Sequence, residues 1–162
     1  QKLVDTTPDF YGGIQNSITY KNWNLDFLFQ FVKRENYDFI SNVPGGGPYN
    51  QSTAITNAWE QAGDQTNTQL HTTGLNGAAV AAYYRYIESD AIITDGSFIR
   101  LKNVALTYDV PLKVTNKVKC KLFLQGQNLL TFTPYKGGDP EFKFSGFLPP
   151  LKVYSAGMTL SF

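Results

Sequence analysis

Two acidic pairs have the residue types and spacing that could support catalysis or metal binding. Glu60 and Asp64 lie four residues apart, and glycosidases act through two carboxyl groups on either side of a sugar. Asp139-Pro140-Glu141 offers oxygen ligands of the kind that calcium prefers. A simpler interpretation is favoured for both pairs, with the first as solvated loop acids and Pro140 fixing a turn. The sequence therefore predicts no enzyme, no metal site and no cofactor.

The composition excludes several other classes of protein. One cysteine and one histidine leave no Cys/His zinc site and no disulfide within the chain. A net charge of +1 argues against a nucleic-acid-binding protein, and 42% hydrophobic with only 17% charged residues argues against disorder. No apolar run approaches the roughly 18 residues of a transmembrane helix. A membrane β-barrel stays compatible, because its strands leave little trace in overall hydropathy.

An aromatic group is the best candidate for binding. It consists of Trp59, Tyr83, Tyr84 and Tyr86. Aromatic rings stack on sugars and also pack against protein surfaces. Three roles stay open for this group, namely packing within the loop that contains it, contact with a partner protein, and contact with substrate.

The framework that carries this group is predicted to be made of strands, because the strongest pattern in the chain has a period of two. Odd positions from Trp23 to Phe31 are all apolar, whereas Asn24, Asp26 and Gln30 lie between them. Such alternation indicates a strand with one apolar and one polar face. A similar run precedes it, and Lys21 and Asn22 between the two runs predict a tight hairpin.

Five antiparallel strands are predicted in total, at about residues 10–21, 22–32, 97–109, 117–127 and 150–162. Their lengths match tilted membrane-spanning strands, which need roughly 9 to 11 residues. The polar positions would line the lumen of a barrel, either along a transport path or as a hydrated wall against other protein. These lumen-facing candidates are Asp26, Gln30, Lys121, Gln125 and Gln127.

The connections alternate between short and long, which is typical of outer-membrane barrels. Short turns would lie on the periplasmic side, and the long connections at about 33–96 and 128–149 would be extracellular loops. Ile55, Ala58, Trp59 and Ala62 have helical spacing, so one short helix is predicted at 52–62, capped by Ser52 or Thr53.

Several segments together resemble the SusC/RagA family of TonB-dependent outer-membrane transporters. Asp95-Gly-Ser-Phe-Ile-Arg-Leu-Lys-Asn-Val-Ala-Leu-Thr-Tyr-Asp-Val-Pro111 closely resembles a C-terminal motif of that family. Leu124-Gln-Gly-Gln-Asn-Leu-Leu130 and Tyr135-Lys-Gly-Gly-Asp-Pro-Glu141 resemble its next signature. Thr7-Pro-Asp-Phe-Tyr-Gly-Gly13 is similar to the entry of an earlier strand. The ordered set of motifs is far more specific than any one of them.

The resemblance implies an all-β chain that supplies the last five antiparallel strands of a transmembrane β-barrel of about 22 strands. It implies import of glycan or peptide oligomers across the bacterial outer membrane, powered by the TonB complex, with a SusD-like lipoprotein over the extracellular mouth. The plug domain and the segment that contacts TonB are expected outside this chain. Five strands cannot close a barrel, so the rest of the same barrel and the lipid bilayer are required partners.

The C-terminal strand carries a second expectation. Apolar residues at every second position before a terminal phenylalanine resemble the signal read by the barrel-assembly machinery; they include Tyr154, Met158, Leu160 and Phe162. The simpler alternative is a final strand that faces lipid. For the chain as a whole, the competing prediction is a soluble, lectin-like β-sandwich that buries the apolar face in a core and binds carbohydrate through its tyrosine-rich loop.

Overall fold

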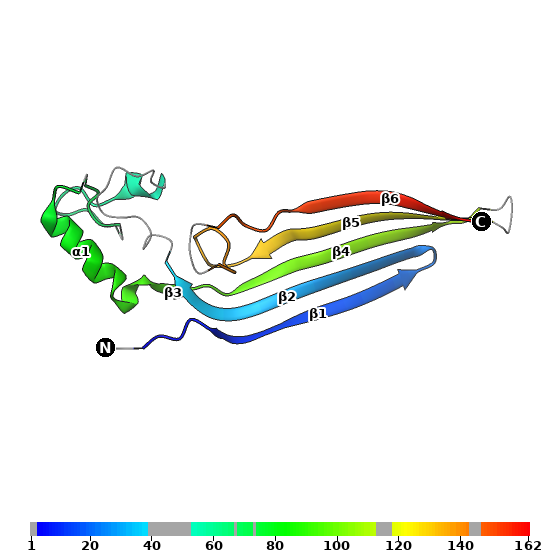
Figure 1. Ribbon diagram of the computed structural model, residues 1–162, viewed down its shortest axis with the longest axis horizontal. Helices are drawn as coiled ribbons and strands as arrows, with labels where there is room; N and C mark the ends of the chain where they lie inside the picture. The colour runs from blue at the N-terminus through cyan, green and yellow to red at the C-terminus, as the bar shows by residue number, and fades with distance from the viewer. Residues whose placement is uncertain (1–2, 39–52, 67, 73, 113–117, 143–146) are drawn as a thin grey trace. The chain divides into compact units, whose positions relative to one another are not determined.

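The structure is a computed structural model that describes residues 3–38, 53–66, 68–72, 74–112, 118–142 and 147–162. It is mainly antiparallel β-sheet, as predicted (Figure 1). The strands are β1 (Pro8–Tyr20), β2 (Trp23–Tyr37), β3 (Ile93–Asp95), β4 (Phe98–Val110), β5 (Lys119–Phe132) and β6 (Val153–Ser161). The helices are α1 (Gly77–Ile87) and two short 3-10 helices, Thr53–Asn57 and Asp90–Ile92. Within the described ranges, no helix has the length and apolar character needed to cross a membrane.

The five long strands form one sheet in the order β1-β2-β4-β5-β6, with every neighbouring pair antiparallel (Figure 1). Strands β1 and β2 are joined by Lys21 and Asn22, and Lys21 adopts a positive φ of 53° in this tight turn. Asn22 fastens the turn to the end of β4, because its Nδ2 donates to the Asp109 carbonyl and its own carbonyl accepts from the Asp109 N–H. The hairpin predicted from the sequence is therefore present.

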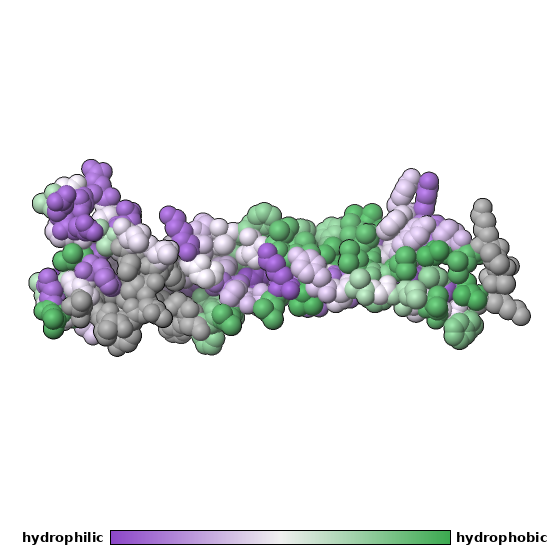
Figure 2. All heavy atoms as spheres, turned by 90° about the horizontal axis from the view of Figure 1, so that it is seen from above, coloured by the Kyte–Doolittle hydropathy of each residue, from purple (hydrophilic) through white to green (hydrophobic). Residues whose placement is uncertain are grey.

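The strand register separates the side chains into two faces. One face, called here the apolar face, carries rows of paired residues such as Ile18, Leu25, Leu106, Leu124 and Ala156. The opposite polar face carries rows such as Ser17, Asp26, Ala105, Gln125 and Ser155. In Figure 2, hydrophobic side chains gather over these strands. The period of two in the sequence thus becomes two chemically different surfaces.

A β-bulge changes the phase of β4. Leu101 pairs with Phe29 and Asn103 pairs with Leu28, so Lys102 is an extra residue opposite consecutive residues of β2. A bulge residue shifts the alternation of its strand by one position. Odd-numbered residues before Lys102 therefore share the apolar face with even-numbered residues after it.

The chain divides into two compact units. The sheet unit comprises residues 8–34, 97–134 and 149–162, and the loop unit comprises 1–7, 35–96 and 135–148. Among the described residues, only Phe98 of the sheet unit and Ile92 of the loop unit are buried hydrophobic side chains. The apolar face of the sheet is consequently left exposed rather than packed into a core.

The helix predicted at 52–62 is wrong in extent and in type. Within that range the structure has only the 3-10 helix Thr53–Asn57, and Ser52 lies outside the described residues. The Trp59 N–H donates to the Thr68 carbonyl, and the next two N–H groups donate to Asp64. Because these donors have other partners, they cannot form the backbone bonds of a continuing helix.

The α-helix of the loop unit is instead α1, which the sequence analysis missed. Asn76 caps its first turn through a hydrogen bond from the Ala79 N–H to Asn76 Oδ1. Its first six residues are Gly-Ala-Ala-Val-Ala-Ala, a composition rich in the best helix-forming residue. Two strands are also longer than expected, since β2 continues to Tyr37 and β5 continues to Phe132.

Candidate functional site

The polar face brings together all five residues predicted to face a lumen. Asp26 lies in the same row as Gln125, while Gln127 pairs with Asn103, Lys121 with Asp109, and Gln30 with Arg100. Hydroxyl and amide groups supply most of the remaining side chains of this face; they include Gln15, Ser17, Thr19, Asn24, Asn103, Thr107, Thr131, Ser155 and Thr159. This surface offers many neutral hydrogen-bonding groups and few charges.

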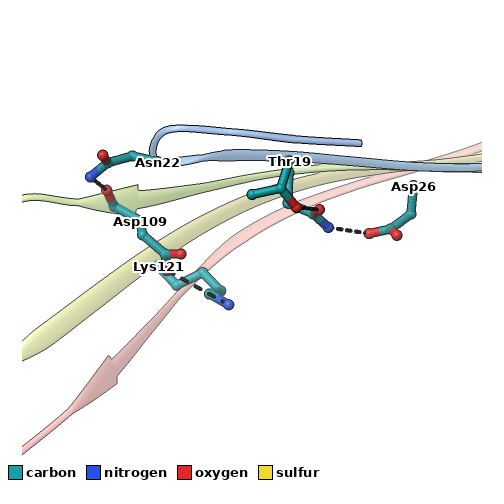
Figure 3. A network of polar contacts seen from close by, with 6 residues as sticks. Thr19, Asn22, Asp26, Asp109 and Lys121 are labelled. Carbon is teal, nitrogen blue, oxygen red and sulfur yellow. Dashed lines mark hydrogen bonds and ion pairs between the residues drawn. The ribbon is translucent and has the colours of Figure 1, made fainter. Parts of the chain in front are cut away.

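A chain of hydrogen bonds orders the polar face near the tight turn (Figure 3). Thr19 Oγ1 donates to Asn24 Oδ1 over 2.8 Å, and Ser17 donates to the same oxygen over 3.2 Å. Asn24 Nδ2 in turn donates to the Asp26 carboxylate. Asp26 is therefore oriented by its neighbours on the same hairpin.

Lys121 approaches Asp109 nearer the short-turn end of the sheet, with 3.6 Å between Nζ and Oδ1 (Figure 3). Both side chains are more than half exposed. An ion pair this exposed adds little stability. It leaves both charges accessible to water and solutes on this face.

Arg100 is a functional candidate that the sequence analysis missed. It lies on the polar face opposite Gln30 and is only 1% exposed. Its Nε donates to Thr131 Oγ1 over 3.0 Å, and its guanidinium lies 5.1 Å from the centre of the Phe98 ring. The adjacent Gln30 Oε1 is buried and accepts no hydrogen bond from the described residues.

The reason for missing Arg100 is the bulge at Lys102. Counting every second residue back from Tyr108 places Arg100 on the apolar face, whereas the bulge returns it to the polar face. The signal was present in the sequence as a phase change, because Ile99 and Leu101 are apolar at odd positions and Val104 and Leu106 at even ones.

The predicted aromatic group is divided by the fold. Tyr84 on α1 is 57% exposed and Trp59 is 38% exposed, whereas Tyr83 and Tyr86 are half-buried. The Tyr83 and Tyr84 rings make an edge contact with centroids 5.7 Å apart. Burial raises the pKa of both Tyr83 and Tyr86, and for Tyr86 the nearby Asp38 carboxylate adds to the rise.

Trp59 lies beside a shallow hollow of the loop unit. The hollow has a volume of about 360 Å³ and is lined by Trp59, Thr66, Thr68, Gln69 and Leu70. Gln69 Nε2 donates to the Ala79 carbonyl of α1 over 3.2 Å. The segment that carries Trp59 is thereby attached to the helix that carries the tyrosines.

Both acidic pairs form hydrogen bonds that are typical of turns. Asp64 Oδ2 accepts hydrogen bonds of 2.9 Å from the N–H groups of both Glu60 and Gln61, and these bonds lower the Asp64 pKa. Asp139 Oδ1 accepts from the Glu141 N–H in the same manner. Within the part of the chain that the structure describes, no three acidic, histidine or cysteine side chains are grouped to hold a metal ion.

Asn36 connects two distant segments of the loop unit and was also missed. It is fully buried, and its Nδ2 donates to the carbonyls of Pro140 and Phe142 over 3.3 and 3.0 Å. A side chain at Gly96 would collide with Asn36, since an added Cβ would lie 2.5 Å from the Asn36 Cβ. Tyr135 adds a parallel bond from its hydroxyl to the Tyr37 carbonyl.

The four residues of the predicted assembly signal are all exposed. Tyr154, Met158 and Leu160 share the apolar face of β6, where they pair with Gly126, Leu122 and Cys120 of β5. The terminal Phe162 follows this strand.

A single antiparallel sheet of strands 9 to 15 residues long, with one apolar and one polar face, has the construction of a membrane β-barrel wall. The fold and its two faces thus define the class as part of the wall of a β-barrel.

Comparisons with known proteins define the family more closely. TonB-dependent receptor P3 of Formosa agariphila is 30% identical over 182 residues, which cover 100% of this chain. TonB-dependent receptor P26 of the same organism is 30% identical over 86% of this chain. The chain spans only 17% and 14% of the length of these relatives. No family model matches the chain.

Solved structures of RagAB agree with these relatives. A chain of the RagAB peptide transporter matches 96% of this chain with a TM-score of 0.70 and 29% identity. Chains of the RagAB peptide importer in the open-open and closed-closed states match with a TM-score of 0.68 each and 28% and 29% identity. Each match covers 97% or 98% of this chain and 17% or 18% of the other. The similarity to the C-terminal portion of SusC/RagA-like TonB-dependent receptors, predicted from the motifs, is therefore confirmed.

Proposed function

We propose that this chain forms part of the wall and the extracellular loops of a TonB-dependent nutrient importer in the bacterial outer membrane. The observation that carries the proposal is the exposed apolar face of a single sheet, in a chain that is similar throughout to TonB-dependent receptors. Trp23, Leu124 and Met158 are all about half exposed or more, and a lipid environment would cover them favourably. A lectin-like sandwich would need a second sheet over this face, whereas the described strands form only one sheet.

The same argument gives an orientation. If the apolar face meets lipid, the polar face with Asp26, Gln30 and Arg100 meets the lumen and the plug. The tight turn at Lys21 and Asn22 would lie in the periplasm, and the loop unit would be extracellular, as the usual sorting of short and long connections requires.

Several partners follow from this arrangement. The outer edges of β1 and β6 pair with no described strand, and unpaired backbone groups are unfavourable in lipid, so the remaining strands of the barrel would complete both edges. A plug domain and the TonB complex would act through parts of the protein outside this chain. Because the RagAB structures are those of a peptide importer, we favour peptides over glycan oligomers as substrate. We assign no catalytic role to this chain.

The extracellular contacts would use the exposed members of the aromatic group. Tyr84 and Trp59 are accessible for a SusD-like lipoprotein or for substrate, while Tyr83 and Tyr86 would mainly hold the loop together. On β6, Tyr154, Met158, Leu160 and Phe162 would serve as the assembly signal and would then face lipid.

Labelling of single cysteines in the full-length transporter tests the orientation. In a background without other cysteines, Tyr84→Cys should react with a membrane-impermeant maleimide in intact cells. Lys21→Cys is the matched control and should react only after the outer membrane is permeabilised. Labelling of Lys21→Cys in intact cells would contradict the orientation.

Uptake of peptides by cells that express the full-length transporter tests the transport role. Accumulation of fluorescent peptides should depend on both the transporter and TonB, and labelled oligosaccharides serve as the comparison. Equal uptake in a strain without TonB would contradict the proposal.

A further inference from the structure

The hollow beside Trp59 has the composition of a small binding site. Its described lining consists of Trp59, Thr66, Thr68, Gln69 and Leu70, around a volume of about 360 Å³. All five belong to the loop unit, and none of them is ionisable. An aromatic ring, an aliphatic side chain and a few neutral polar groups are the usual composition of a site for an uncharged, partly apolar group.

Hydrogen bonds fix the wall of the hollow that carries the indole. The Trp59 N–H donates to the Thr68 carbonyl over 2.8 Å, and the Thr66 hydroxyl donates to the Asn57 carbonyl. The Asp64 carboxylate closes the turn between these two segments by accepting from the two N–H groups that follow Trp59. The Trp59 side chain is nevertheless 38% exposed. A tryptophan that is held in place and accessible offers a ligand a large contact area at a low entropic cost.

Two polar groups of the lining have hydrogen-bonding capacity left. The Thr66 hydroxyl is used twice, because it donates to the Asn57 carbonyl and accepts from the Thr68 N–H over 3.1 Å. Gln69 donates through Nε2 to the Ala79 carbonyl of α1, and its Oε1 accepts no bond from the described residues. The Thr68 hydroxyl likewise has no partner among them. The hollow therefore offers one acceptor, Gln69 Oε1, and one hydroxyl that can donate.

We propose that this hollow binds one residue of a peptide substrate, and that this residue carries an aliphatic or aromatic side chain. The side chain would lie against the Trp59 indole and Leu70. The N–H of the bound residue would donate to Gln69 Oε1, and its carbonyl would accept from the Thr68 hydroxyl. The inference rests on the proposed function, in which a peptide is the substrate, and it names the part of the peptide that the loop unit recognises.

The balance of polar groups favours a peptide residue over a sugar. A residue of a peptide presents one N–H donor and one carbonyl acceptor, which matches the one acceptor and one hydroxyl of the hollow. A sugar ring also stacks on an indole, but it presents hydroxyl groups around its whole edge. Among the described residues of the lining there is no carboxylate or guanidinium to bind two such groups at once.

Binding of matched peptides to the full-length transporter in detergent tests the apolar part of the site. The probes are two fluorescein-labelled heptapeptides of alanine and serine, with either phenylalanine or serine at the central position. Fluorescence anisotropy measures the two affinities. The wild type should bind the phenylalanine peptide about tenfold more tightly than the serine peptide. Trp59→Ala should remove most of this preference and leave the affinity for the serine peptide unchanged.

Two further variants control for indirect effects. Trp59→Phe is the conservative variant and should keep most of the preference, because an aromatic ring remains in place. Leu75→Ala removes an apolar side chain that is 93% exposed in the same unit but does not line the hollow. It should bind both peptides as the wild type does.

The polar part of the site is tested separately. Methylation of the nitrogen of the central phenylalanine removes the N–H proposed to donate to Gln69, and should weaken binding about three- to tenfold. Methylation of the first peptide nitrogen instead is the control and should have no effect. Thr68→Val removes the hydroxyl at nearly constant shape and should weaken binding of the unmethylated peptide by a similar factor.

Three results would overturn this inference: equal affinity of the wild type for the two peptides, the same loss in Leu75→Ala, or an equal loss of both peptides in Trp59→Ala. An oligosaccharide whose binding depends on Trp59 when that of the peptides does not would also overturn it. The shift of unheated protein on a denaturing gel monitors folding. If peptide import depends on TonB but the affinities do not depend on Trp59, only this inference is wrong. If the wild type does not import peptides in a TonB-dependent manner, the proposed function itself fails.

Discussion

The sheet unit and the loop unit of this chain are stabilised in different ways. The sheet unit depends on continuous backbone ladders between five long strands, and it leaves most of its apolar side chains exposed. The loop unit depends on individual hydrogen bonds between side chains and backbone. Asn36, Tyr135 and Gln69 donate to backbone carbonyls, and Asp64 accepts from a backbone N–H. A ladder tolerates many side-chain changes but not a change in register, whereas a single bond is lost with a single side chain.

Deletion of Lys102 should therefore have the largest effect. Removing the bulge residue would shift one half of β4 by one position, which would turn either Arg100 or the residues after the bulge to the opposite face. Because a shift of one position turns every side chain of that half of the strand to the wrong face, we expect no folded barrel in the outer membrane. The measurement is the shift of unheated protein on a denaturing gel.

Lys102→Ala is the matched control, because it keeps the number of residues in β4. It should assemble almost as well as the wild type. Normal assembly of the deletion variant would show that the bulge does not set the register.

A charge on the apolar face should have the next largest effect. Phe27→Arg in β2 should destabilise the barrel by about 2 to 4 kcal/mol if it lies near the membrane midplane. Gln125→Arg lies in a neighbouring row of the polar face and should leave stability almost unchanged. Urea unfolding in lipid vesicles measures both. Equal destabilisation by the two arginines would contradict the assignment of the two faces.

Asn36→Ala should act on the loop unit alone. It would leave the Pro140 and Phe142 carbonyls without this donor, at a local cost of about 1 to 3 kcal/mol. Hydrogen exchange should show loss of protection in residues 135–142, with the barrel still assembled. Asn16→Ala, an exposed position of β1, is the control and should change neither region. A barrel that fails to assemble in Asn36→Ala would show that the two units are not independent.

The smallest effect should be a dependence on pH at Asp64. Its folded pKa is lowered by the hydrogen bonds from the Glu60 and Gln61 N–H groups, so the ionised form stabilises this turn. That stabilisation is present above the usual pKa of 3.8 and is lost as the pH falls through the lowered value. Protection of these two amides from exchange should decrease in that acidic range. Asp64→Asn should have no such pH dependence. If the amides of this variant lose protection over the same pH range as in the wild type, the Asp64 carboxylate is not the cause.

Much of the sheet was predictable because its pattern is local. The alternation at residues 23–31 and the turn at Lys21 and Asn22 predict a hairpin without any knowledge of distant contacts. The five lumen-facing candidates share one face because a strand places every second side chain on the same side. The helix α1 could also have been found, since Asn76 precedes an alanine-rich segment.

The sequence by itself thus determined the strands, the two faces and the family resemblance. Only the tertiary structure decided that Lys102 forms a bulge and returns Arg100 to the polar face, because a bulge is defined by the residues of the neighbouring strand. It likewise decided that the segment after Asn57 is not helical, because the N–H groups of residues 59–61 bond to Thr68 and Asp64. Asn36 became a connecting residue only when the fold brought it to residues 140–142, more than one hundred positions away along the chain.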